Sequence, residues 1–184
     1  MSNSSLAFAF DDPSPPVVVM AAQIIASELM AGRALSRSDV TRIMTEQFGG
    51  SDALGRWSVR DAHAATELAQ VQYLKASDQI LLSSPIDEVD QFFSSLDARL
   101  PTQTNRSDEQ IEWQQFATPP HFAWLAARAC ALATGELVLE PSAGTGMLAV
   151  WAAKAGTRLA LNEISPLRRD CLSAQFPAAR VTGH

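Results

Sequence analysis

The last third of the chain alternates short apolar runs with helix-forming segments, and this order constrains the fold more than any other feature. The runs GELVLE, TRLALNE and AARVTGH predict strands, the last of them only as an opening. MLAVWAAKAG and SPLRRDCLSAQF stand between them and predict helices. Strand, helix, strand, helix, strand is the pattern of a doubly wound α/β fold. GELVLE, which ends in an acid, is predicted to be a buried strand.

The first hundred residues have a different pattern and predict helices only. Ser36 with Asp39, and Ser58 with Asp61, resemble capping pairs that would open two of these helices. We find no catalytic constellation in this region. The sequence therefore divides into a flexible arm at 1–16, a helical region at 17–106 and an α/β region at 107–184.

Composition excludes several classes of protein. Apolar residues make up 47% of the 184 positions and charged residues 18%, which is enough for a packed core. The net charge of -6 excludes a basic nucleic-acid coat protein. No apolar run near the start is long enough to cross a bilayer, and the first segment lacks the basic residues of a secretion signal. Two cysteines make no disulfide framework, so we expect a cytoplasmic protein without membrane contacts.

The turn after the first predicted strand contains the candidate ligand-binding residues. Gly144 and Gly146 allow a close backbone approach, and the following helix start offers N–H groups to a ligand. Glu140 and Glu163 end the first two strands, where an acid is placed to accept hydrogen bonds from a ribose diol. With Ala149, the glycines also fit the dinucleotide fingerprint G-x-G-x-x-G/A.

Glu140 discriminates between a ligand that carries a pyrophosphate and a ligand that carries a cationic group. A carboxylate at the mouth of this loop would repel a pyrophosphate, whereas it would attract a cationic amino acid or a sulfonium. The order acid-x-x-x-Gly-x-Gly therefore favours S-adenosylmethionine over NAD. A purely structural alternative stays open, in which Glu140 caps the neighbouring helix.

These segments carry a resemblance to a known family. VLEPSAGTGMLA resembles the first cofactor motif of class I S-adenosylmethionine-dependent methyltransferases, in the branch that methylates the adenine amino group, and LNEIS resembles the second motif. QFATPP stands upstream, where that branch has a further cofactor segment, although Ala117 replaces a common aromatic residue. Residues 57–184 are most similar to the N-terminal region of bacterial bifunctional methylase/helicase proteins of the strawberry-notch type.

The resemblance implies a fold and a set of roles. The fold would be a helical N-terminal region followed by the first half of a Rossmann-like methyltransferase sheet. The implied cofactor-binding residues are Phe116, Thr118 and Pro119 at the methionine end, Glu140, Ala143, Gly144 and Gly146 in the loop beneath it, Glu163 on the ribose and Ile164 on the adenine. No metal ligand is implied.

The family's catalytic motif, [DN]-P-P-[YFW], is not found after the third predicted strand, so no catalytic residue is assigned. We therefore expect this chain to be the cofactor-binding part of a longer nucleic-acid adenine N6-methyltransferase. Its partners would be DNA or RNA, bound through the complete protein, and the missing C-terminal part or a helicase domain. Two alternatives stay open: a non-catalytic helical docking module with a nucleotide-binding stub, and a dinucleotide oxidoreductase.

Other polar and sulfur-containing residues receive structural interpretations. Arg168 and Arg169 are expected on a solvated helix face, with a contact to phosphate as the alternative. His121 is expected on the surface of a first helical turn, with a contact to substrate as the alternative. Cys130 and Cys171 lie on Ala- and Leu-rich helices and are predicted to be buried packing residues.

Overall fold

The structure is a computed structural model that describes residues 16–102 and 117–184. The arm predicted at 1–16 lies outside the described residues except for Pro16, which precedes the first helix. The helical region contains α1 (Val17–Met30), α2 (Arg37–Phe48), the short helix η1 (Asp52–Leu54), α3 (Val59–Ala76) and α4 (Ile86–Asp97). The remaining elements are α6 (Pro120–Ala129), β1 (Leu137–Glu140), α7 (Ala149–Lys154), β2 (Arg158–Asn162), α8 (Pro166–Gln175) and β3 (Arg180–Thr182).

The two predicted capping pairs are confirmed. The Ser36 hydroxyl accepts the N–H of Asp39, whose carboxylate accepts the N–H of Ser36 in return. Ser58 and Asp61 form the same reciprocal pair at the start of α3. Each pair satisfies N–H groups that the first turn of a helix leaves without partners, which fixes where α2 and α3 begin.

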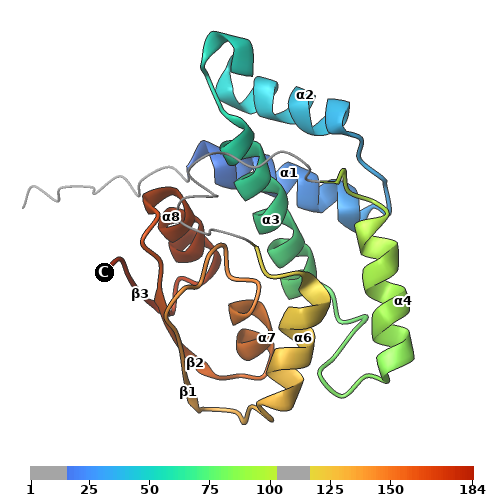
Figure 1. Cartoon of the computed structure of the whole chain (residues 1–184), viewed down its shortest axis with the longest axis vertical. Helices are drawn as coiled ribbons and strands as arrows, with labels where there is room; N and C mark the ends of the chain where they lie inside the picture. Colours follow the sequence, from blue (N-terminus) through green and yellow to red (C-terminus); the bar gives the residue numbers. More distant parts are fainter. Residues whose placement is uncertain (1–15, 103–116) are drawn as a thin grey trace, which may run out of the picture.

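Helix α3 lies between the rest of the helical region and the α/β part (Figure 1). It packs along α1 on one side and contacts α7 and α8 on the other. A single buried hydrophobic cluster includes Leu68 of α3, Phe93 of α4, Trp124 of α6 and Trp151 of α7. The helical region and the sheet therefore share one core. None of the helices in the described ranges is long and apolar enough to cross a membrane.

The three strands form a parallel sheet in the order β1-β2-β3, so the chain has a mixed α/β fold as predicted. Leu139 pairs with Ala160, and Asn162 pairs with Thr182. Pro120 and Pro166 occupy first-turn positions of α6 and α8, where a missing N–H costs nothing. The parallel register brings the carboxyl ends of β1 and β2 to the same edge of the sheet.

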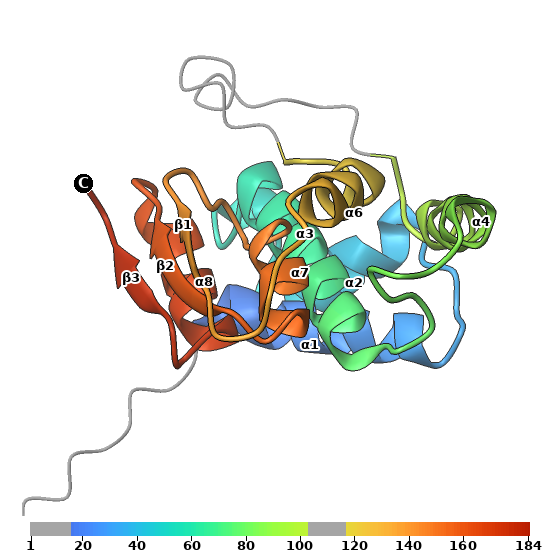
Figure 2. The ribbon, with the colours of Figure 1, turned by 90° about the horizontal axis from the view of Figure 1, so that it is seen from below.

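The prediction that β1 is buried is wrong, because two of its four residues are exposed and the other two are half-buried. Leu137 is 63% exposed and Leu139 is 70% exposed, whereas Leu161 on the opposite face of the sheet is 1% exposed. The reason is that successive side chains of a strand point to opposite faces. Within the described ranges, helices cover one face of the sheet and leave the other face open (Figure 2).

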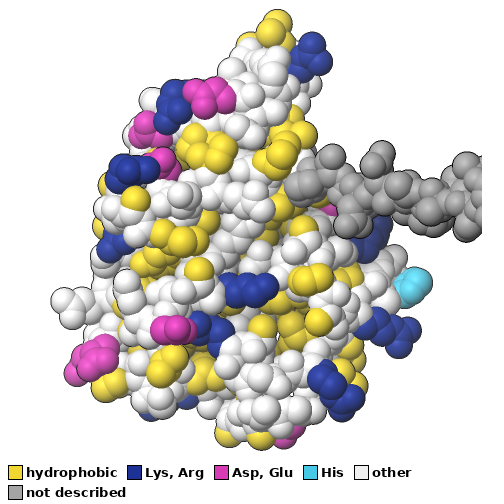
Figure 3. Space-filling model, turned by 180° about the vertical axis from the view of Figure 1, so that it is seen from behind, with side chains coloured by type: hydrophobic (Ala, Val, Ile, Leu, Met, Phe, Trp, Pro, Cys, Tyr) yellow, Lys and Arg dark blue, Asp and Glu magenta, His cyan; other side chains and the backbone are white. Residues whose placement is uncertain are grey.

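One of the two cysteines differs from expectation, and the described residues show no segregation of charge on the side that Figure 3 draws. On the side opposite to the view of Figure 1, charged and hydrophobic side chains are interspersed (Figure 3). Cys171 is buried, as predicted. Cys130 is exposed, because it follows the last residue of α6 and does not face the core.

Candidate functional site

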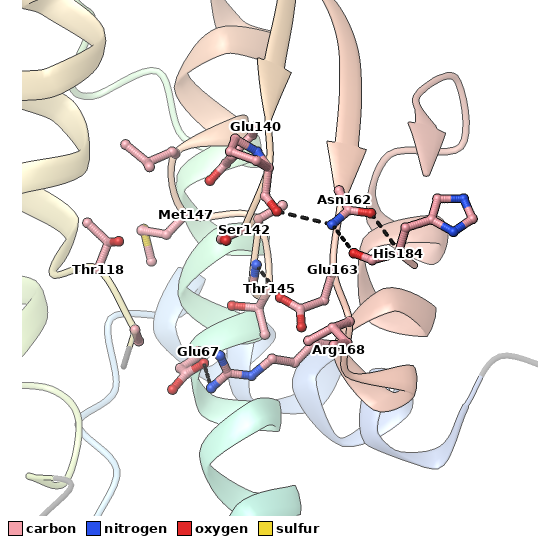
Figure 4. A pocket seen from close by; sticks show the side chains of 16 residues that line it. Glu67, Thr118, Glu140, Ser142, Thr145, Met147, Asn162, Glu163, Arg168 and His184 are labelled. Atoms are coloured by element: carbon pink, nitrogen blue, oxygen red, sulfur yellow. Dashed lines mark hydrogen bonds and ion pairs between the residues drawn. The ribbon is translucent and has the colours of Figure 1, made fainter. Parts of the chain in front are cut away.

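A cavity of about 350 Å³ lies at the carboxyl ends of β1 and β2. Its walls come from the loop after β1, the end of β2, the first turn of α8, the segment before α6 and one side chain of α3. Figure 4 shows Thr118 on one side of the cavity and Asn162 with His184 on the other. Six of the predicted cofactor-binding residues line it: Thr118, Glu140, Ala143, Gly144, Glu163 and Ile164.

The loop between β1 and α7 is held to the end of β2 by a backbone hydrogen bond. The N–H of Ala143 donates to the carbonyl of Asn162 at 2.9 Å. Gly144 follows with a φ of +58°, a left-handed conformation that glycine adopts without steric cost. The loop therefore crosses the end of β2 and leaves its backbone facing the cavity.

Glu163 anchors this loop from below. Its Oε2 accepts the N–H of Gly144 at 2.9 Å, and its Oε1 accepts the N–H of Ser165 at 2.7 Å. The residue is 6% exposed. An ionised carboxylate has about four acceptor sites, so these two bonds leave capacity for a ligand hydroxyl.

Glu140 faces the same cavity from the end of β1. Burial raises the pKa of Glu140 to about 8, the N–H of Ala149 opposes this rise, and the nearby carboxylate of Glu163 adds to it. Ala149 is the first residue of α7, so Glu140 also meets the start of that helix. Its helix-capping and ligand-facing positions are thus compatible with each other.

Gly146 is not among the residues that line the cavity, in contrast to its predicted place beneath a cofactor. Its φ is +98°, and a Cβ added there would overlap the ring of Phe176 and lie 3.2 Å from a methyl carbon of Leu172. The residue is a glycine because the loop packs tightly against α8. Gly144 lines the cavity, and a Cβ there would meet only Arg168, at 3.8 Å.

The segment before α6 reaches the cavity with one predicted residue. Thr118 lines it, whereas Pro119 caps α6 and lines a neighbouring groove instead. Phe116 lies outside the described residues. Ile164 is 50% exposed at the cavity mouth.

Two charged residues of the cavity differ from expectation, since Glu67 was missed by sequence reasoning and Arg168 was expected on a solvated face. Arg168 Nη2 lies 3.5 Å from Glu67 Oε2, and the two residues are only 7% and 4% exposed. The prediction of a solvated face for Arg168 is therefore wrong, because α8 turns this side chain inward against α3. Burial raises the pKa of Glu67, and Arg168 opposes the rise. The available signal was an acid at core spacing in α3, between buried Ala64 and Val71.

Asn162 was also missed as a residue of the site. Its Nδ2 donates to the carbonyls of Pro141 and His184, at 3.1 and 3.0 Å. Its Oδ1 accepts the hydroxyl of Thr182 and the N–H of His184. This amide therefore ties the loop after β1 to the end of β3 beside the cavity.

Within 16–102 and 117–184, no group of three or more His, Cys, Asp or Glu side chains is arranged to hold a metal ion. Searches against family models, curated proteins and solved structures find no match to this chain.

Proposed function

We propose that this chain binds S-adenosylmethionine at the cavity beside β1 and β2, as the cofactor-binding part of a nucleic-acid adenine N6-methyltransferase within a longer methylase/helicase protein. The observation that carries the proposal is the convergence of Thr118, Glu140, Glu163 and the Gly144 loop on one cavity. These residues come from three separate segments of the sequence that resemble the family's motifs.

The strand order supports a Rossmann-like interpretation. Three parallel strands in the order β1-β2-β3 correspond to one half of the doubly wound order 3-2-1-4-5-6. In such sheets, ligands bind beyond the carboxyl ends of the strands, where this cavity lies. Its volume of about 350 Å³ falls within the range of small-molecule sites.

The charges of the cavity favour this cofactor over a dinucleotide. Glu67, Glu140 and Glu163 face it together with Arg168 as its basic residue. A pyrophosphate would favour the protonated form of these acids and gain no attraction from them, whereas the sulfonium and ammonium groups of S-adenosylmethionine favour the ionised form, which attracts them. When bound, the cofactor would supply an electrophilic methyl group. The residues of this chain would bind and orient it, and the acceptor amine would be held by residues outside this chain.

Isothermal titration of the 184-residue chain tests the proposal. We expect a saturable binding signal with S-adenosylmethionine and none with NAD. Glu140→Gln should weaken the binding of S-adenosylmethionine, while Asp87→Asn, which removes an exposed carboxylate in the first turn of α4, should leave it unchanged. Binding of NAD alone would favour an oxidoreductase, and binding of neither ligand would favour a helical docking module.

A further inference from the structure

Arg168 occupies an unusual position in the cavity. It is the only Lys or Arg among the described residues that line the cavity, and it lies in the first turn of α8. Its side chain is 9% exposed, so water solvates little of its charge. A buried guanidinium is costly unless acceptors surround it.

The acceptors on the protein do not meet this need. In the described parts of the chain, the guanidinium has one hydrogen-bond acceptor, Glu67 Oε2, at the long distance of 3.5 Å. Arg carries several N–H donors in a planar fork that fits a carboxylate with two parallel bonds. Nη1 lies beside the Gly144 loop, 3.8 Å from where a Cβ of that residue would stand. The fork thus borders the ligand space with donors to spare.

The ligand has one group that matches these donors. Of the polar groups on S-adenosylmethionine, only the carboxylate of its amino-acid end is anionic. Glu67, Glu140 and Glu163, the acids that line the cavity, offer that carboxylate no cationic partner. Arg168 is the side chain of the cavity whose charge attracts it.

We infer that Arg168 binds the carboxylate of the amino-acid end of S-adenosylmethionine through a bidentate pair, and that Glu67 of the helical region positions the guanidinium for this contact. The inference rests on the proposed function and adds the side chain that recognises the amino-acid end of S-adenosylmethionine. Glu67 stands 101 positions before Arg168, so α3 becomes part of the binding site and not only a support for it.

Two ligands that differ only in the carboxylate test the inference: S-adenosylmethionine and decarboxylated S-adenosylmethionine. The dissociation constant of each is measured by titration of the full chain. Wild type should prefer S-adenosylmethionine by about 10- to 100-fold, the usual range for hydrogen bonds between charged partners. Arg168→Met should reduce this preference to within about twofold.

A second variant controls for the possibility that Arg168→Met does not fold. Arg168→Met leaves Glu67 buried without its cationic partner, so the double variant Arg168→Met/Glu67→Gln is measured beside it. The ratio of two dissociation constants in one preparation is unaffected by the folded fraction. Arg180→Met, which removes an exposed charge from β3, is the matched control and should keep the wild-type preference.

The outcomes separate the two proposals. If wild type binds both ligands equally, or if both Arg168 variants keep the preference, the carboxylate assignment is overturned while cofactor binding stands. If wild type and Arg180→Met bind neither ligand, the proposed function fails and the assignment fails with it. Loss of the preference in both Arg168 variants, with retained binding of the decarboxylated ligand, establishes the contact.

Discussion

The carboxylate of Glu163 holds the backbone of Gly144, with Oε2 and the glycine nitrogen 2.9 Å apart. The other oxygen accepts the N–H of Ser165, so one side chain joins the loop after β1 to the start of α8. A ribose-binding role would use the acceptor sites that these bonds leave free. Glu163 is therefore a residue on which the shape of the loop and the binding of a ligand both depend.

This double role predicts a measurable loss of stability. In Glu163→Gln, one oxygen would become an NH2 group facing a backbone N–H. We expect the free energy of unfolding to fall by about 1–3 kcal/mol, the cost of a buried donor left without its acceptor. Urea unfolding measures the change. Asp170→Asn alters an exposed acid of α8 and should shift the free energy by less than about 0.5 kcal/mol. Equal stability of Glu163→Gln and wild type would contradict the anchoring role.

Gly146 should be more sensitive to alanine than Gly49, another glycine with a positive φ. A Cβ at Gly146 would overlap Phe176, whereas Gly49, with a φ of +67°, has nothing within 4 Å of that position. We expect Gly49→Ala to cost about 1–2 kcal/mol of backbone strain and Gly146→Ala to add an overpacking cost of about 1–3 kcal/mol. Comparing the two variants by urea unfolding isolates the contact with α8. Equal losses would show that the ring of Phe176 moves aside freely.

Glu140 should make cofactor binding depend on pH. Because its pKa is about 8, the residue is largely protonated near neutrality in the free protein. A cationic ligand favours the ionised form, so affinity for S-adenosylmethionine should rise with pH and level off above about pH 8. The dissociation constant should fall by up to about tenfold per pH unit below that point. Titrations across this range in Glu140→Gln should show a flatter profile, and an unchanged profile would rule out Glu140 as its source.

The same raised pKa predicts an effect on stability in the absence of ligand. The pKa of the Glu140 carboxyl rises from an ordinary value of 4.5 in the unfolded chain to about 8 in the folded protein, so the folded state holds the proton more tightly. The stability that this carboxyl contributes is complete below about pH 4.5 and is lost as pH rises through about 8. Between these two pKa values, Glu140 can lower the free energy of unfolding by up to about 1.4 kcal/mol per pH unit. Subtracting the pH profile of Glu140→Gln from that of wild type removes the parallel contributions of Glu67 and Asp97, whose pKa values are also raised by burial.

Local sequence signals predicted where the helices begin and that the loop after β1 faces a cavity. Capping pairs, first-turn prolines and glycines act over a few residues, and Ser36, Ser58 and Pro166 stand where the helices begin. Parallel strands bring their carboxyl ends together whatever the details of packing. For that reason Glu140 and Glu163 meet at one cavity as expected.

Contacts between residues far apart in the sequence could not be predicted from these local signals. The partner of Arg168 lies in α3, and no local pattern links the two positions. Gly146 satisfies a ligand-loop motif, yet the structure uses it to fit the ring of Phe176. A motif fixes the backbone of the turn, whereas neighbouring elements decide which residues face the ligand and which face the core.

The open face of the sheet gives a final prediction about the two leucines of neighbouring strands. Leu139 of β1 is 70% exposed and Leu161 of β2 is 1% exposed, although both stand in apolar runs. Leu161→Ala should reduce the free energy of unfolding by about 2–5 kcal/mol, because it removes buried methyl groups and leaves a cavity. Leu139→Ala should change it by less than about 0.5 kcal/mol, since most of that side chain already meets water. Urea unfolding of the two variants at several protein concentrations measures both effects. A large, concentration-dependent loss in Leu139→Ala would instead mean that another surface covers this leucine in solution.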